Sequence, residues 1–252
     1  MYVDVSLKDG IAELLLNHAP VNAFPAAGWS HLAQVVASLG ADDAVRVVVI
    51  AAEGRGFCAG VDVKELARDA SLIAAVNRGC YDAFAAIYDC AVPVISAVHG
   101  FCLGGGIGIA GSSDLVIASE DASFGLPEID RGALGAATHL MRMFGMQQTR
   151  RMLYTGEPIS AREAHELGGV LEVVKRDELR PAARALAAKI AGKSPRAVRL
   201  AKWSLNGIEL LDVKQSYRFE QGFTFELYTS PDSQEARDAF VEKRDAKFEK
   251  KK

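Results

Sequence analysis

The chain has 252 residues, of which 50% are hydrophobic and 24% charged, so it can bury a large core as a soluble protein. Lys and Arg number 29 against 32 Asp and Glu, a formal net charge of −3. Because no overall positive field attracts phosphates, this charge argues against nucleic acid as the main partner. No run reaches the roughly 18 apolar residues of a membrane span, and no basic stretch precedes an apolar run at the N-terminus. We therefore expect a cytoplasmic protein with no membrane partner.

The charge is unevenly distributed along the chain. Residues 241–252 hold six basic and three acidic side chains, whereas residues 1–240 hold 23 basic and 29 acidic ones, a net charge of −6. From composition alone, this basic end is typical of a solvated helix terminus. The cysteines form no CxxC pair and are expected to be reduced, mostly buried thiols; they are Cys58, Cys80, Cys90 and Cys102.

Strands and helices alternate through the first two-thirds of the chain. The expected strands are 2–8, 11–16, 45–51, 93–98, 115–118 and 170–174, and Asp9-Gly10 is a hairpin turn signal between the first two. Helices are expected over 25–39 and 71–90, and then without strands over 177–192, 194–209, 212–228 and 233–248. This order predicts an α/β core over residues 1–192 and a helical region over residues 193–252.

The segment Gly54–Leu66 (GRGFCAGVDVKEL) follows a buried strand and has three glycines before a helix near Asp62. Backbone N–H groups at a helix start are unpaired and attract negative charge, so the segment is a candidate anion or carbonyl site. Asp62 is expected to be the N-cap, with Glu65 at capping-box spacing. An ordinary strand-to-helix turn with a good cap fits the same residues.

The segment Val92–Ser113 carries five glycines between 104 and 111, which indicate close approach of a ligand or of another backbone. Gly106–Gly111 is a literal GxGxxG, the dinucleotide-binding fingerprint, so an NAD-dependent dehydrogenase must be considered. Spacing argues against it, because the next strand begins near Leu115 and leaves too few residues for the usual crossover.

The segment Ser123–Gly135 (SFGLPEIDRGALG) places Glu128 and Asp130 two apart in a loop bounded by Gly and Pro. A carboxylate on a loop supported by a core is a candidate general base, particularly where apolar neighbours raise its pKa. A solvated turn acid is the competing interpretation.

Taken together, these segments resemble the crotonase (enoyl-CoA hydratase/isomerase) superfamily over nearly the whole chain. The resemblance depends on several ordered motifs, namely APVNAF (19–24), GRGFCAGVDVKEL (54–66), PVISAVHGFCLGGGIGIA (93–110), SDLVIASEDASFGLPEIDRG (113–132) and DAFVEKRDAKF (238–248). FCxGGGIG, FGLPE, RGALGAATHL and EQGFTFEL make it most similar to the actinobacterial branch that opens the last steroid rings as CoA thioesters. The resemblance implies a crotonase fold, a spiral of ββα units whose C-terminal helices form a trimer interface, often doubled to a hexamer.

The resemblance also assigns roles to residues. The backbone N–H groups of Val61 and Gly105 would form an oxyanion hole for the thioester carbonyl, a type of site that stabilises a developing enolate. Ala59, Asp62, Val63 and Gly104 would complete the substrate site, and Phe240 and Lys243 would meet the adenine and phosphates of CoA, commonly from a neighbouring subunit.

The acids depart from the pattern of the family's two-acid hydratases, which carry one glutamate two residues after GGG and another in the PE dipeptide. Here the first position is Gly108, while Glu128 is retained. The resemblance therefore implies single-acid chemistry, in which Glu128 shuttles a proton or activates water against a ring carbonyl β to the thioester. Asp130 and Arg131 would support Glu128 or meet the substrate, although a surface ion pair fits them equally well.

Several hypotheses about function stay open at this point. The main prediction is a CoA-thioester enzyme that needs no metal or redox cofactor, acting hydrolytically on a cyclic keto-acyl-CoA. The alternatives are an enoyl-CoA hydratase or isomerase of fatty-acid catabolism, and a non-catalytic CoA-binding relative. His99 and His139 are interpreted as packing residues rather than as bases.

Overall fold

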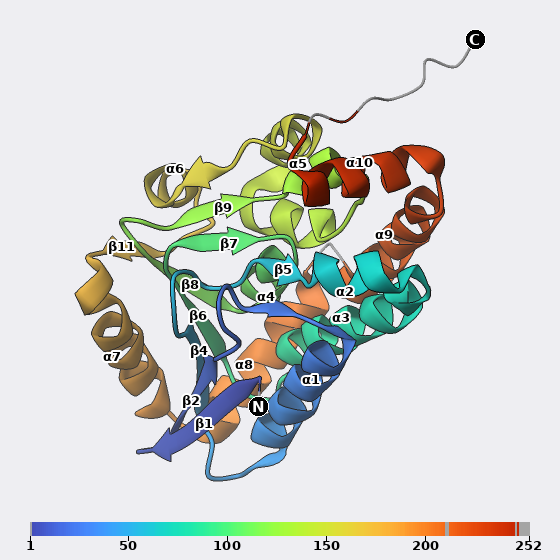
Figure 1. Cartoon of the computed structure of the whole chain (residues 1–252). Coiled ribbons are helices and arrows are strands. Elements are labelled where there is room, and N and C mark those ends of the chain that lie inside the picture. The colour runs from blue at the N-terminus through green and yellow to red at the C-terminus, as the bar shows by residue number, and fades with distance from the viewer. Residues whose placement is uncertain (1, 210–211, 245, 247–252) are drawn as a thin grey trace.

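The computed structural model describes residues 2–209, 212–244 and 246 (Figure 1). Its main sheet has six strands in the described part of the chain, and all neighbours are parallel except the first two. In spatial order these are β1 (Val3–Lys8), β2 (Ile11–Leu16), β4 (Val47–Ala52), β6 (Val94–Val98), β8 (Leu115–Ser119) and β11 (Glu172–Val174). The expected hairpin is present, because Asp9 and Gly10 both have positive φ and Lys8 pairs with Ile11.

A repeating unit of two strands and a helix builds the body. In each repeat the first strand joins the main sheet and the second joins a smaller sheet: β3 (Ala23–Phe24) pairs with β5 (Gly60–Val61), and β7 (Phe101–Leu103) pairs with β9 (Ser123–Gly125), which pairs with β10 (Ile159–Ser160). The helices of the body are α1 (Ala26–Ala41), α2 (Val63–Arg68), α3 (Ile73–Tyr88), α4 (Gly105–Ser112), α5 (Ala137–Thr155) and α6 (Ala161–Glu166). This is the spiral of ββα units that the resemblance implies.

The main sheet is covered on both faces, which explains the nearly continuous apolar runs of its central strands. On one face, Val48 and Ile50 join the large core under α1 and α3. On the other face, Val47 and Val49 pack against α7 (Leu179–Ala191), which lies alone on that side in Figure 1. The sheet thus forms a rigid support whose strand-to-helix turns carry the candidate site.

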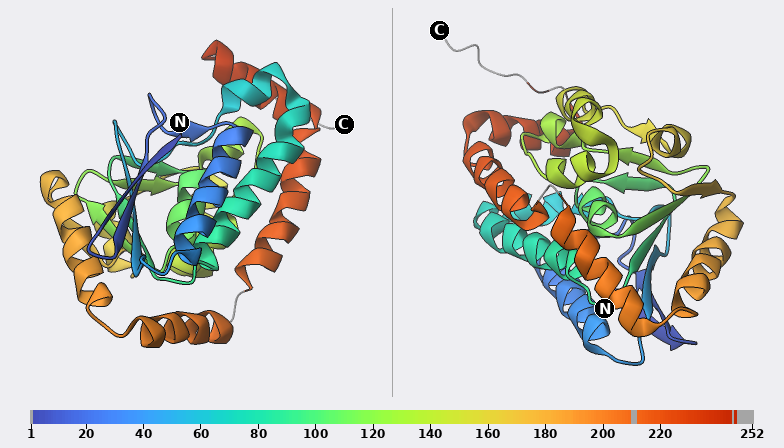
Figure 2. Two further views of the ribbon diagram at one scale, coloured as in Figure 1. Left: turned by 90° about the horizontal axis from the view of Figure 1, so that it is seen from below. Right: turned by 180° about the vertical axis from the view of Figure 1, so that it is seen from behind.

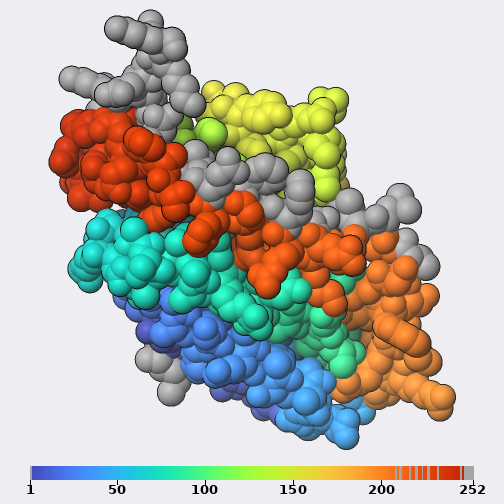
Figure 3. All heavy atoms as spheres, turned by 90° about the vertical axis from the view of Figure 1, so that its right-hand side faces the viewer, coloured from blue at the N-terminus to red at the C-terminus, as the bar shows by residue number. Residues whose placement is uncertain are grey.

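The C-terminal helices pack on the body. After α7, the chain runs through α8 (Pro195–Ile208), α9 (Val213–Tyr228) and α10 (Pro231–Glu242). Figure 3 shows α1, α3 and α9 as adjacent bands on one face, and Figure 2 shows α8 crossing beneath the body. Tyr217 and Tyr228 of α9 belong to the main core. No helix in the described chain is long and apolar enough to cross a membrane.

Two local expectations need correction. Asp62 is the N-cap of α2, where its carboxylate accepts from Lys64 N at 3.0 Å, but Glu65 does not complete a capping box. Glu65 Oε2 instead accepts from Ala26 N at 3.0 Å and so caps the start of α1. The last helix ends at Glu242 instead of continuing to residue 248, since Lys243 adopts a left-handed conformation. Residues 245 and 247–252, with most of the basic end, lie outside the described part of the chain.

Candidate active site

The glycine-rich segment that leads into β5 lies against the start of α4. Gly60 has φ +92°, and a Cβ built there would lie 2.9 Å from Gly105 N. Gly104, the residue before α4, has φ +54°. Both positions require backbone conformations and close approaches that only glycine tolerates, which accounts for the AGVD and GGG motifs.

The N–H groups of Val61 and Gly105 are positioned as donors. Asp62 N donates to Phe24 O at 3.0 Å, and successive N–H groups of a strand point to opposite sides, so the N–H of Val61 points away from β3. Gly105 is the first residue of α4, and the first N–H groups of a helix have no partner within the helix. The two donors, together with the positive end of the α4 dipole, fit a developing oxyanion.

Asn22 holds this arrangement in place from the APVNAF motif. Its buried amide donates to the carbonyl oxygens of Glu53 at 2.9 Å, Gly56 at 3.1 Å and Phe57 at 3.1 Å. These bonds fix the segment that leads into Gly60 and Val61. No local sequence pattern reveals this role of Asn22, because its contacts join residues more than 30 positions apart.

Glu128 reaches the same place from the opposite side. It lies on a short 3-10 helix, Pro127–Arg131, which begins with proline and ends at a left-handed Gly132. The half-buried Glu128 carboxylate lies directly against the α-carbon of Gly104, because a Cβ at that glycine would collide with Glu128 Oε1. One carboxylate therefore adjoins the residue that precedes the Gly105 donor.

A cavity of about 110 Å³ opens beside these groups. Of the predicted site residues, those lining it are Ala59, Val61, Val63, Gly104, Gly105, Glu128, Arg131 and Phe240. Asp62, Asp130 and Lys243 are not among its lining residues. Asp130 is exposed and its carboxylate lies against Gly156 at the end of α5, whereas the Arg131 guanidinium stacks 4.7 Å from the centre of the Phe240 ring.

Phe84 occupies the position where a second acid would project. Gly108 lies on α4, and a Cβ built there would collide with the end of the fully buried Phe84 ring. Phe84 itself lines the cavity. The site is therefore built around a single carboxylate, and Glu128 is the only acidic side chain among the described lining residues.

The cysteine and histidine side chains near the site, namely Cys58, His99 and His139, do not supply a second base. Burial raises the pKa of the Cys58 thiol to about 12, and Cys58 Sγ donates to Asn22 O at 3.1 Å. Burial lowers the pKa of His139 to about 3, and its ring packs edge-on against Phe84. Burial also lowers the pKa of His99, whose Nε2 lies 3.1 Å from Gly54 O. Among the described residues, no group of three His, Cys, Asp or Glu side chains could hold a metal ion.

The far wall of the cavity comes from α9 and α10, which motif analysis only partly anticipated. Tyr217, Thr224 and Tyr228 of α9 and Arg237 of α10 line it together with Phe240. The loop before α5 contributes Ala133–Ala136. Ser233 of α10 donates to Gly132 O, so α10 packs directly beside the Glu128 segment of its own chain.

The fold is a spiral of ββα units, and the site places two backbone N–H donors and one carboxylate at a single cavity. Residues 6–251 match the enoyl-CoA hydratase/isomerase family, and the chain belongs to that family. It is 52% identical over 236 residues to a (7aS)-7a-methyl-1,5-dioxo-2,3,5,6,7,7a-hexahydro-1H-indene-carboxyl-CoA hydrolase of Rhodococcus jostii, covering 93% of this chain and 92% of the relative. It is 51% identical to the Mycobacterium tuberculosis protein of the same name, covering 94% and 96%. A crystal structure of an enoyl-CoA hydratase from Mycobacterium avium subsp. paratuberculosis superposes with TM-score 0.89 at 25% identity, covering 99% of both chains.

Proposed function

We propose that this enzyme hydrolyses a carbon–carbon bond in the ring of a cyclic β-keto-acyl-CoA. Two observations support the proposal. The hydrolases of R. jostii and M. tuberculosis share about half of its residues over more than nine-tenths of their length, and their name specifies a fused bicyclic acyl group with two ketones. The site holds a single carboxylate, which suits the activation of water at a ketone. By the motif resemblance, the reaction belongs to steroid-ring catabolism.

The chemistry follows from the placement of three groups. Glu128 takes a proton from water as the water oxygen adds to the ring ketone β to the thioester. The bond between that ketone carbon and the thioester α-carbon then breaks, leaving a carboxylic acid and a thioester enolate. The enolate oxygen rests on the N–H groups of Val61 and Gly105, which stabilise it. Glu128 returns the proton to the α-carbon, so the net change is addition of one water and opening of one ring. No electron acceptor is involved, and we propose that CoA within the substrate is the only coenzyme.

The contact between Phe84 and Gly108 is the observation that carries this proposal. Hydration of a simple enoyl-CoA in this family uses two carboxylates, as the resemblance implies, and here the second position is filled by a ring. Liquid chromatography with mass spectrometry on a cyclic β-keto-acyl-CoA and on crotonyl-CoA tests it. We expect the cyclic thioester to gain one water with ring opening and crotonyl-CoA to react at least about 100-fold more slowly. Faster hydration of crotonyl-CoA would favour the hydratase alternative, and no turnover of either would favour a CoA-binding relative.

We further propose that Phe240 and Lys243 bind the CoA part of the substrate. Phe240 lines the cavity of its own chain and stacks with Arg131, which supports an adenine or pantetheine contact at its mouth. Lys243 is exposed one turn further on. Assembly as a trimer or hexamer would add contacts from a neighbouring subunit.

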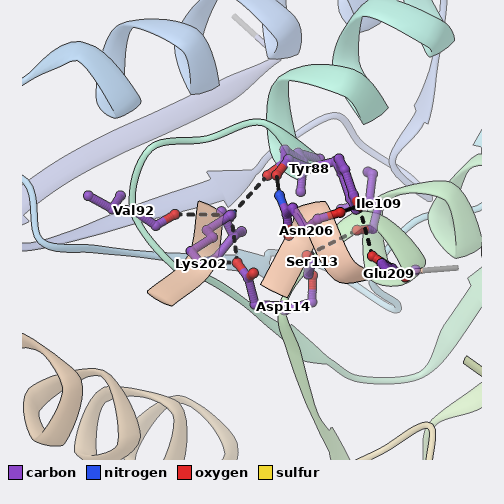
Figure 4. Close-up of polar contacts among 12 residues, drawn as sticks. Tyr88, Val92, Ile109, Ser113, Asp114, Lys202, Asn206 and Glu209 are labelled. Carbon is purple, nitrogen blue, oxygen red and sulfur yellow. Dashed lines mark hydrogen bonds and ion pairs between the residues drawn. The ribbon is translucent and has the colours of Figure 1, made fainter. Parts of the chain in front are cut away.

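The exposed face of α8 supports the assembly proposal. Trp203 and Leu205 are 76% and 63% exposed, which is unusual for side chains of this size on a packed helix. The helix itself is firmly attached, because the buried Lys202 ammonium reaches Asp114 Oδ2 at 2.7 Å and Val92 O at 3.2 Å (Figure 4). We propose that a second copy of the chain covers this face.

Light scattering coupled to size exclusion measures this assembly. We expect the wild-type chain to elute as a trimer or hexamer and Trp203→Glu to shift it toward the monomer. Tyr154→Glu, on a residue of α5 that is 71% exposed, is the matched control and should keep the larger mass. A monomeric wild-type protein would overturn the proposal.

For location we propose the cytoplasm, supported by four buried free cysteines.

A further inference from the structure

Tyr228, the last residue of α9, has a polar group that the fold leaves unused. The residue lines the cavity and is 5% exposed, and its hydroxyl is buried without a hydrogen-bond partner in the described structure. A buried hydroxyl without a partner is destabilising, and such groups are few in folded proteins. Trp29, His31, Ser112, His139 and Gln148 also carry buried unpaired polar atoms, but none of these residues lines the cavity.

The neighbouring polar groups are already engaged within the protein. Thr224 Oγ1 donates to Leu134 O at 2.5 Å, and the Tyr217 hydroxyl bonds to the Cys80 thiol. Arg237 Nη1 donates to Tyr228 O at 3.1 Å, and Arg237 Nη2 donates to Gln234 Oε1 at 2.6 Å. Of the described hydroxyls on the α9 and α10 wall of the cavity, that of Tyr228 is therefore available to a ligand.

Arg237 fixes the orientation of the Tyr228 ring. Its guanidinium carbon lies 3.8 Å from the ring centre, a close cation–π contact, and the arginine is itself 9% exposed. Burial raises the pKa of the Tyr228 phenol, so the group remains a neutral hydrogen-bond donor at neutral pH. A rigid neutral donor in a mostly apolar wall suits a neutral acceptor such as a ketone oxygen.

We propose that Tyr228 donates a hydrogen bond to a second carbonyl of the acyl group, remote from the thioester, and so selects diketo over monoketo ring systems. This inference rests on the proposed ring-opening function. The thioester oxygen is assigned to Val61 and Gly105 and the reacting ketone to Glu128, which leaves Tyr228 for a third oxygen. The hydrolases of R. jostii and M. tuberculosis are named for a dioxo acyl group, in agreement with such an oxygen.

The test compares two substrates that differ at one position. One is a bicyclic β-keto-acyl-CoA with a second ketone, and the other carries a methylene in place of that ketone. For wild-type enzyme we expect kcat/KM to be about 10- to 100-fold higher with the diketone, because a site with a buried donor rejects an analogue that leaves the donor unpaired. For Tyr228→Phe the ratio should fall close to one, through loss of activity on the diketone alone.

Tyr217→Phe is the matched control, since it removes a phenol that is bonded within the protein. It should change both substrates by the same factor and leave their ratio intact. Equal loss on both substrates in Tyr228→Phe, or no wild-type preference for the diketone, would overturn the inference. Wild-type enzyme that opens neither ring would instead overturn the proposed function.

Calorimetric binding of the same two CoA esters to Glu128→Gln enzyme tests the role of Tyr228 separately from the proposed ring opening, because binding is measured without turnover. We expect the diketone to bind about 10-fold or more tightly than its methylene analogue. Equal affinities would overturn the role of Tyr228 even if Tyr228→Phe failed to fold.

Discussion

The two walls of the cavity are built in different ways. The wall of β5, α4 and the Glu128 segment is held by the sheet, by the Asn22 amide and by glycines whose neighbours leave no room for a Cβ. The wall of α9 and α10 is made of side chains, namely Tyr217, Tyr228, Arg237 and Phe240. The first wall offers fixed backbone donors and one carboxylate, which many CoA thioesters can use. The second offers shape and one hydroxyl available to a ligand, that of Tyr228, which we propose distinguishes one acyl group from another.

Changes to the first wall should therefore lower kcat, and we expect the largest effect from Glu128→Gln. The amide keeps the size of the side chain but cannot take a proton from water, so kcat should fall by about 10²- to 10⁴-fold. Affinity for the CoA ester, measured by calorimetry, should change by less than about threefold. The exposed Glu157→Gln is the control and should match wild type in both measurements. Retention of wild-type kcat in Glu128→Gln would show that the carboxylate is not the proton carrier.

Gly108→Glu tests whether the first wall can accept a second acid. The new side chain would meet the buried Phe84 ring, so we expect a loss of about 1–3 kcal/mol from overpacking, and more if the carboxylate is buried charged. Urea unfolding measures this loss, and hydration of crotonyl-CoA should not increase. Gly222→Ala, at a helical glycine with open space around it, is the matched control and should be neutral or slightly stabilising. A stable Gly108→Glu enzyme with hydratase activity would contradict the role given to Phe84.

The junction of the two walls should be sensitive to acid through His139, whose ring packs against both Phe84 and Tyr217. Folded His139 takes a proton only near pH 3, whereas the unfolded side chain takes one near 6.5, so the unfolded chain binds more protons between these values. The free energy of unfolding should thus fall as pH falls below about 6.5, by about 2 kcal/mol at pH 5.

His139→Phe, or His139→Leu if the larger ring is not accommodated, should flatten this part of the pH profile measured by urea unfolding. Replacing the exposed His165 with Gln should leave the slope unchanged. A slope between pH 6.5 and 5 that is the same with and without His139 would show that another group governs the acid sensitivity.

The smallest expected effect lies at the mouth of the cavity, in Lys243→Ala. An exposed ammonium that meets a phosphate contributes a screened attraction, so affinity for a CoA ester should weaken a few-fold at low salt and less at high salt. Calorimetry at two salt concentrations measures it, with Lys193→Ala on another exposed lysine as the control. Unchanged affinity at both salt concentrations would show that Lys243 does not contact the CoA phosphates. Phe240 would then be the proposed CoA contact that remains on α10.

The sequence predicted the first wall far better than the second. Glycines, a loop acid and buried strands leave local signals that mark the segments of this wall. Within those segments the motif resemblance assigned Val61, Gly105 and Glu128, and all three line one cavity. The contact of Phe84 with Gly108 joins residues 24 positions apart on separate helices, and neither residue type signals it alone. Tyr228 and Arg237 belong to no motif. They line the cavity only because α9 and α10 fold back over the Glu128 segment, which the local sequence does not indicate. Glu65 shows the same limit, since its spacing fits a capping box while its carboxylate caps another helix.

Ring opening in heavy-oxygen water tests the central claim most directly. A cyclic β-keto-acyl-CoA is incubated in this solvent with wild-type or Glu128→Gln enzyme, and tandem mass spectrometry locates the label in the product. The wild-type product should carry one heavy oxygen in the new carboxylate and none in the thioester, and Glu128→Gln should form almost no labelled product. Label in a hydroxyl group of an intact ring, or equal labelling by the two enzymes, would contradict hydrolysis by a single glutamate beside a backbone oxyanion hole.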